Sequence, residues 1–132
     1  FSVNRENFRQ GMRDLQKAAE YLDQGESLLV FPEGTRSEDG KLQDFYTGVF
    51  IIALKSKNAR IVPLVMDGTR QILPKGKIGL GRGRDVYITG RTPVEVRKEY
   101  GLKERERLKE DMHKLMQQMY SEIGEWKKQK RN

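Results

Sequence analysis

The sequence predicts an α/β fold, in which a mixed sheet is covered by helices. Apolar residues at helical spacing and short apolar runs of strand length alternate along the 132 residues. Strands that alternate with helices form sheets with helical layers, and ligands gather at the carboxyl ends of such strands. The apolar runs have the size of core elements, and none reaches the ~18 residues that a membrane-spanning helix needs.

Three segments have the pattern of helices. Residues 6–24 place their apolar side chains on one face, and Gly25 stops the helix. Thr47–Lys57 is apolar on most sides and has Thr47 in the N-cap position. Gly101–Lys128 is predicted to be a long helix. Its apolar stripe consists of Leu108, Met112, Leu115, Met119, Ile123 and Trp126.

Three segments have the pattern of strands, two because they are apolar runs and the third because its residues alternate. Ser27–Phe31 is apolar almost throughout, which predicts a buried strand of a parallel sheet. Arg60–Met66 predicts a second buried strand, in which Pro63 removes a ladder hydrogen bond and therefore implies an edge, a bulge or a special turn. Asp85–Thr89 is the third. Polar or basic glycine-containing loops are expected at Glu33–Leu42 and at 74–84.

Composition limits the classes of function. The net charge of +7 favours an anionic partner, such as nucleic acid, anionic lipid or an acidic protein. The absence of cysteine excludes disulfides, thiolate metal sites and a cysteine nucleophile. The chain opens on Phe1, without an initiator Met, and leads straight into a helix, so we expect a piece of a longer protein. We expect 1–132 to form a single partial domain that ends in a helix over 102–132.

The most informative stretch follows the first predicted strand and reads FPEGTRS, residues 31–37. A glycine after the strand lets the backbone approach a ligand closely. Two hydroxyl side chains and the guanidinium fork of Arg36 suit a phosphate group. Glu33 either orients Arg36 or accepts a hydrogen bond from a substrate hydroxyl. On chemistry alone, an ordinary turn with a Glu–Arg surface pair explains the stretch equally well.

Several blocks in order give the sequence a family resemblance. FPEGTRS resembles the most diagnostic block of the 1-acylglycerol-3-phosphate acyltransferases, the lysophospholipid acyltransferases. The segment 44–48 is similar to a second block of that family, although Tyr46 stands where lysine is usual. The segment 61–68 is similar to the block with a proline beside the substrate, and 3–5 to the end of a block with an arginine near the phosphate. The resemblance runs from about Val3 to Val94.

The resemblance implies a glycerolipid acyltransferase-like fold and a set of substrate-binding residues. Arg5 and Arg36 would clamp the acceptor phosphate, Gly34 and Thr35 would shape the loop, and Glu33 would hold the loop or contact the glycerol. Pro63 would shape the wall beside the substrate. The implied reaction transfers an acyl group from a thioester to the free hydroxyl of 1-acylglycerol-3-phosphate in phospholipid biosynthesis, without a metal or another cofactor.

The catalytic block of the family, His-x-x-x-x-Asp, is missing from this sequence. In the family it lies before the arginine block, whereas His113 follows FPEGTRS and has Gln118 five residues on. We therefore assign no catalytic residue in this chain, expect His113 to be a solvated or packed helix residue, and expect the 132 residues alone to be inactive. A non-catalytic lipid-phosphate binding module is the alternative.

The resemblance also implies partners and a location. The acceptor would be a lysophospholipid, and the acyl donor would be acyl-CoA or acyl carrier protein. An anionic membrane surface suits both the positive charge and the bilayer substrates, so we expect membrane association at the cytoplasmic face. The apolar stripe of the C-terminal helix is either core or an interfacial contact. We expect no nucleic-acid partner, because the aromatic residues lie mostly within apolar runs.

Overall fold

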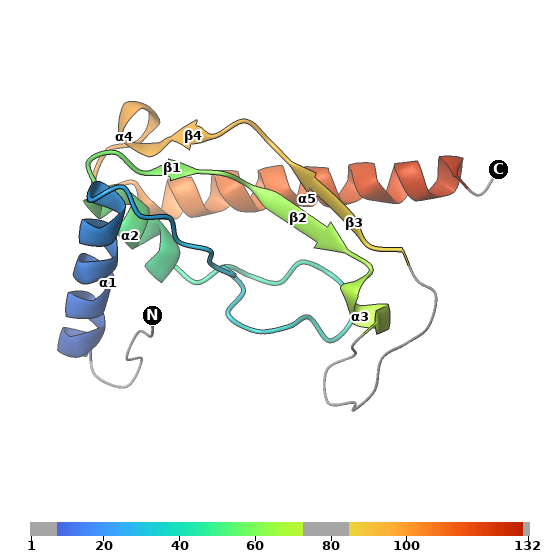
Figure 1. The fold of residues 1–132 in the computed structure, drawn as a ribbon, viewed down its shortest axis with the longest axis horizontal. Coiled ribbons are helices and arrows are strands. Elements are labelled where there is room, and N and C mark those ends of the chain that lie inside the picture. Colours follow the sequence, from blue (N-terminus) through green and yellow to red (C-terminus); the bar gives the residue numbers. More distant parts are fainter. Residues whose placement is uncertain (1–7, 73–84, 131–132) are drawn as a thin grey trace.

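The computed structural model describes residues 8–72 and 85–130 (Figure 1). Three longer helices are α1 (Phe8–Asp23), α2 (Gly48–Lys55) and α5 (Arg105–Gln129). The strands are β1 (Arg60–Ile61), β2 (Leu64–Asp67), β3 (Tyr87–Gly90) and β4 (Val94–Glu95), and two short helices are α3 (Thr69–Ile72) and α4 (Val96–Glu99). The fold is mixed α/β, as predicted. None of the described helices is long and apolar enough to cross a bilayer.

The strands form two antiparallel ladders, β1 with β4 and β2 with β3. Ile61 pairs with Val94, and Leu64 pairs with Gly90. Between these pairs, the two residues 62–63 lie opposite the three residues 91–93. This mismatch is a bulge, and it coincides with Pro63, whose carbonyl accepts the Arg91 N–H at 3.2 Å. The predicted interruption at the proline is therefore confirmed, and Pro63 marks the point where the strand changes partner.

The prediction of a buried parallel strand over Ser27–Phe31 is wrong for the structure described. The segment is neither helix nor strand, and Leu29 and Phe31 are 78% and 66% exposed. Both ladders that the described residues form are antiparallel. An apolar run becomes a buried strand only where strands pair with it and layers cover it. Among the described residues no strand pairs with this segment, and Leu28 alone of its residues is half-buried, against helices α1 and α2.

The second predicted strand is only half buried. Val65 is 2% exposed and faces α5, whereas Leu64 and Met66 are 52% and 43% exposed. This alternation follows from the period of two in a strand. Helix α5 covers one face of the β2–β3 ladder, and the other face lines the cavity described below.

Helix positions agree well with the sequence pattern. Leu15 and Ala19 of α1 are buried against Ile52 of α2. Gly25, at φ 92°, ends the first helix as predicted. Thr47 does not cap α2, because it has helical dihedral angles and makes no side-chain cap bond. The predicted loop at 74–84 lies outside the described residues.

Helix α5 connects two parts of the core. Leu108 and Met112 pack with α2 and α4, while Met119 and Ile123 pack with β2. The apolar stripe predicted for this helix is therefore core for most of its length, and Trp126 at its end is 44% exposed.

Gly68 fixes the turn between β2 and α3, and we expect Gly68→Ala to destabilise the protein. Its φ is +104°, and a Cβ would overlap the carbonyl oxygen of Asp85. The combined strain predicts a loss of about 1–3 kcal/mol in the free energy of unfolding, measured by urea titration. The matched control is Gly124→Ala in α5, where a Cβ meets no atom within 4 Å. That change should stabilise by up to about 1 kcal/mol. A Gly68→Ala protein as stable as the unsubstituted one would contradict the prediction.

Candidate functional site

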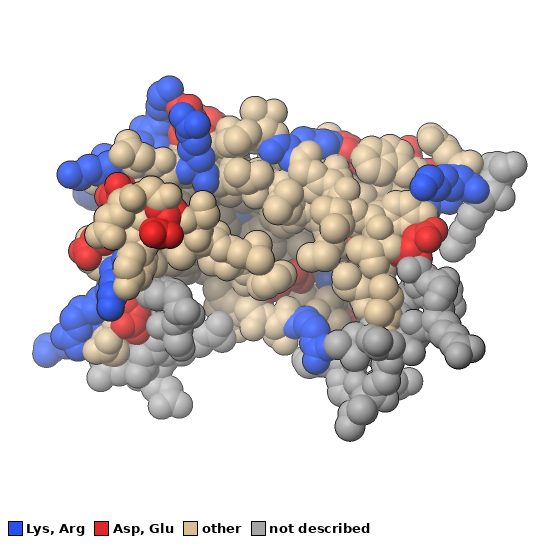
Figure 2. Space-filling view, in the orientation of Figure 1, with Lys and Arg blue, Asp and Glu red and all other residues tan. Residues whose placement is uncertain are grey.

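A cavity of about 1000 Å³ opens between the segment 28–37, the strands β1 and β2, and helix α5. Figure 2 shows it as a hollow in the middle of one face, bordered mainly by uncharged side chains, with most charged ones farther out. Its volume lies at the upper end of the range of about 300–1000 Å³ that is usual for small-molecule pockets.

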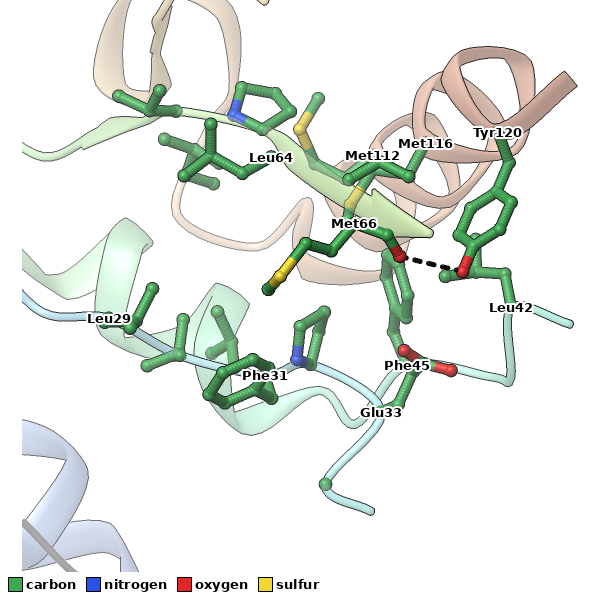
Figure 3. A pocket seen from close by; sticks show the side chains of 18 of the residues that line it. Leu29, Phe31, Glu33, Leu42, Phe45, Leu64, Met66, Met112, Met116 and Tyr120 are labelled. Carbon is green, nitrogen blue, oxygen red and sulfur yellow. Dashed lines mark hydrogen bonds between the residues drawn. The ribbon is translucent and has the colours of Figure 1, made fainter. Parts of the chain in front are cut away.

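The walls of the cavity are largely apolar. Leu29 and Phe31 lie on one side and face Leu64 and Met66 across the opening (Figure 3). All four side chains are exposed although they are apolar, and all four line the cavity. Three further apolar side chains, from α5 and the loop before α2, also line it: Met112, Met116 and Phe45. Apolar walls of this kind accept hydrocarbon.

The structure brings five of the six predicted binding residues to this cavity. Glu33, Gly34, Thr35 and Arg36 line it at the loop that follows Phe31, and Pro63 lines it from the bulge. Gly34 makes the turn possible, because its φ is +67° and its N–H donates to the Phe31 carbonyl at 3.0 Å. The sixth residue, Arg5, lies outside the described residues.

Arg36 differs from the other cations of the cavity. Lys41 and Arg60 also line it, but they pair with Asp39 at 4.0 Å and with Glu95 at 3.2 Å. Arg36 makes no ion pair or hydrogen bond with any residue that the structure describes. Its guanidinium donors therefore remain available to an anion, and a planar fork of donors matches phosphate.

Glu33 holds the loop and does not pair with Arg36. One of its carboxylate oxygens accepts the N–H of Gln43 at 2.8 Å. A second bond, from the Tyr46 N–H to the Pro32 carbonyl at 2.8 Å, closes the same loop. The interpretation as a Glu–Arg surface pair is therefore wrong for this structure.

Ser37 also works within the loop. Its hydroxyl donates to Asp39 at 3.0 Å and accepts the N–H of Gly40 at 2.9 Å. The two hydroxyls of the motif are therefore not equivalent. Both line the cavity, but Thr35 makes no such bond with a residue that the structure describes.

His113 lies outside the residues that line the cavity. Its Nε2 is 3.1 Å from the carbonyl oxygen of Gln43, and its ring meets the Phe45 ring edge-on, with 4.8 Å between centroids. It is a packed helix residue, one of the two states expected. Within the described ranges, no three His, Cys, Asp or Glu side chains are placed to hold a metal ion.

Tyr120 and Met116 are cavity residues that the sequence reasoning missed. The Tyr120 hydroxyl donates to the carbonyl of Met66 at 3.0 Å (Figure 3). Burial, together with the nearby charges of Asp67 and Glu33, raises the pKa of Tyr120. Met116 and Tyr120 follow Met112 by four and eight residues, which places all three side chains on one side of α5. This spacing was the signal from which the sequence could have predicted both cavity residues.

Comparisons with known proteins agree with this site. The family model described as Acyltransferase matches residues 1–67. A chloroplastic 1-acyl-sn-glycerol-3-phosphate acyltransferase of Brassica napus is 39% identical over 80 residues, which cover 61% of this chain and 23% of the relative. A probable 1-acyl-sn-glycerol-3-phosphate acyltransferase of Mycoplasma pneumoniae is 30% identical over 98 residues, 70% of this chain and 36% of the relative.

A solved structure shows the same fold. The crystal structure of the 1-acyl-sn-glycerophosphate acyltransferase PlsC from Thermotoga maritima superposes with a TM-score of 0.74 and 31% identity, over 85% of this chain and 46% of that one. The chain thus spans less than half the length of these relatives. The family model covers half of the chain, and the sequence blocks, the site and the fold all agree with it. The chain belongs to the acyltransferase family, with the 1-acylglycerol-3-phosphate acyltransferases as its relatives.

Proposed function

We propose that the chain is the acceptor-binding part of an enzyme that transfers an acyl group to the free hydroxyl of 1-acylglycerol-3-phosphate. The observation that carries the proposal is Arg36, a cation without a partner among the described residues, beside a large apolar cavity. A lysophospholipid has one phosphate and one hydrocarbon chain, and it fits a site with apolar walls and a cation that is unpaired among the described residues. The names of the relatives support the same acceptor.

In the proposed reaction, the acceptor hydroxyl attacks the carbonyl carbon of an acyl thioester. A C–O bond forms, the C–S bond breaks, and the base that takes the hydroxyl proton returns it to the leaving thiolate. His113 does not serve as that base, because its Nε2 is bound to a backbone carbonyl outside the cavity. The base is proposed to lie outside these 132 residues. This chain contributes positioning, which alone lowers a barrier by several kcal/mol.

The test is an acyl-transfer assay on a longer protein that includes these residues, beside the 132-residue chain alone. The acceptors are 1-acylglycerol-3-phosphate and, as a matched control, 1-acylglycerol without the phosphate. We expect the longer protein to acylate the phosphorylated acceptor with a much higher kcat/KM, and the chain alone to be inactive. Equal use of both acceptors would contradict a role for the phosphate site.

The same assay addresses the acyl donor, for which acyl-CoA and acyl carrier protein are the two proposals. The positive net charge favours the acidic carrier protein modestly. An inactive longer protein that still binds 1-acylglycerol-3-phosphate would identify a lipid-phosphate binding module in place of an enzyme.

We also propose that the protein works at the cytoplasmic face of a membrane. Its acceptor resides in the bilayer, and the charge of +7 attracts anionic headgroups. Sedimentation with anionic vesicles, but not with neutral ones, is the expected result. If the protein sediments with neither kind of vesicle, these residues make no peripheral contact with a membrane.

A further inference from the structure

The backbone N–H and the backbone carbonyl of Gln43 each make a contact with a side chain elsewhere in the chain. Its N–H donates to a carboxylate oxygen of Glu33 at 2.8 Å, and its carbonyl oxygen lies 3.1 Å from Nε2 of His113. Glu33 belongs to the motif that lines the cavity, whereas His113 belongs to helix α5, 70 residues farther along the chain than Gln43. One residue thus connects the loop of the candidate site to the long helix.

The geometry fixes the role of the imidazole. A carbonyl oxygen only accepts hydrogen bonds, so Nε2 of His113 is the donor in this contact. The ring is oriented by its edge-on contact with Phe45, which is 6% exposed and stacks on Phe50 in the core. The donor is therefore held in place by packing before any ligand binds.

We infer that His113 is a positioning residue for the acceptor phosphate. It holds the carbonyl of Gln43, the N–H of Gln43 holds Glu33, and Glu33 precedes Arg36 by three residues. This chain of contacts anchors the turn that presents the guanidinium to the cavity. The inference deepens the proposed function and rests on it, because it assumes that Arg36 binds the phosphate.

This role makes a specific kinetic prediction. His113 does not itself line the cavity, so it acts through the two loop residues that it contacts, Gln43 and Phe45. Its loss should raise KM for 1-acylglycerol-3-phosphate by about two- to tenfold, the worth of one hydrogen bond. KM for the acyl thioester should stay the same, and kcat should change little.

The experiment compares two substitutions in the longer protein. His113→Phe keeps an aromatic ring against Phe45 but has no donor, whereas His113→Gln places an amide N–H near the position of Nε2. Hydrogen exchange of the peptide 33–45, followed by mass spectrometry, reports the loop directly. We expect faster exchange and a higher acceptor KM in His113→Phe, and recovery of both in His113→Gln. If His113→Phe does not fold, His113→Asn, whose amide does not reach the Nε2 position, takes its place beside His113→Gln.

Tyr100→Phe is the matched control for a general loss of stability. This substitution removes the hydrogen bond from the Tyr100 hydroxyl to Asp111, which lies in α5 as His113 does. Tyr100 does not line the cavity. It should leave the exchange of 33–45 and the acceptor KM unchanged. If His113→Phe behaves like this control, or raises both KM values alike, the inference is wrong. If the longer protein transfers no acyl group, the proposed function fails, and the exchange of 33–45 still decides whether His113 holds the loop.

Discussion

Arg36→Ala is expected to lower kcat/KM for 1-acylglycerol-3-phosphate by roughly ten- to hundredfold. The side chain has no ion-pair partner among the described residues, so its removal leaves none of their carboxylates unpaired, and we expect its effect to fall on the ligand. A hydrogen bond to a charged group is worth about 1.5–3 kcal/mol, which corresponds to that range. Steady-state kinetics of the longer protein, with the acceptor varied, provide the measurement.

Two controls sharpen this prediction. Arg36→Lys keeps the charge but loses the planar fork, so it should recover only part of the rate. Arg105→Ala removes the same charge from α5, where the side chain contacts Glu106 and does not line the cavity. That variant should match the unsubstituted enzyme. Unchanged kinetics in Arg36→Ala would show that the phosphate binds elsewhere. An equal loss in Arg105→Ala would show that the effect of Arg36 is a general effect of charge and not a contact in the cavity.

Leu108→Ala is expected to destabilise the protein by about 2–5 kcal/mol. Leu108 is 0% exposed and belongs to the core cluster formed with α2 and α4. Shortening a fully buried leucine loses burial and leaves a cavity that the neighbours fill only in part. Urea unfolding followed by circular dichroism gives the free energy of unfolding.

Leu102→Ala is the matched control, because the same side chain is 63% exposed there. It should change the free energy of unfolding by less than about 0.5 kcal/mol. Leu108→Met, which conserves volume, should cost less than about 1.5 kcal/mol. A Leu108→Ala protein that unfolds at the same urea concentration as Leu102→Ala would contradict the packing described here.

The sequence predicted the helices better than the strands. The spacing of Leu15 and Ala19, or of Leu108 and Met112, depends on local geometry, and both pairs are buried as the pattern predicted. The run Ser27–Phe31 depends on neighbours elsewhere in the chain, and its composition does not say whether they are present. The short elements α3, α4 and β4 span two to four residues, too few for a periodic pattern to show.

The candidate site was predicted in part. The motif gave Glu33, Gly34, Thr35 and Arg36, and the structure places Pro63 at the same cavity. The contact between His113 and Gln43 could not be predicted, because it joins a side chain to a backbone carbonyl 70 residues away. Every residue has a backbone carbonyl that can accept a hydrogen bond, so the residue type does not indicate which carbonyl does so. Only the fold brings the two together.

Helix α5 has a consequence for how acceptor preference changes. Its inner face carries Ile123, which does not line the cavity, yet Ile123 packs with Val65, which does. The cavity wall thus rests on side chains that do not themselves line the cavity. Mutational screens for altered acceptor use should therefore recover substitutions on this hidden face as well as in the FPEGTRS loop. Under the proposed function, we expect chains that share that loop to differ in acceptor preference when the helix behind it differs.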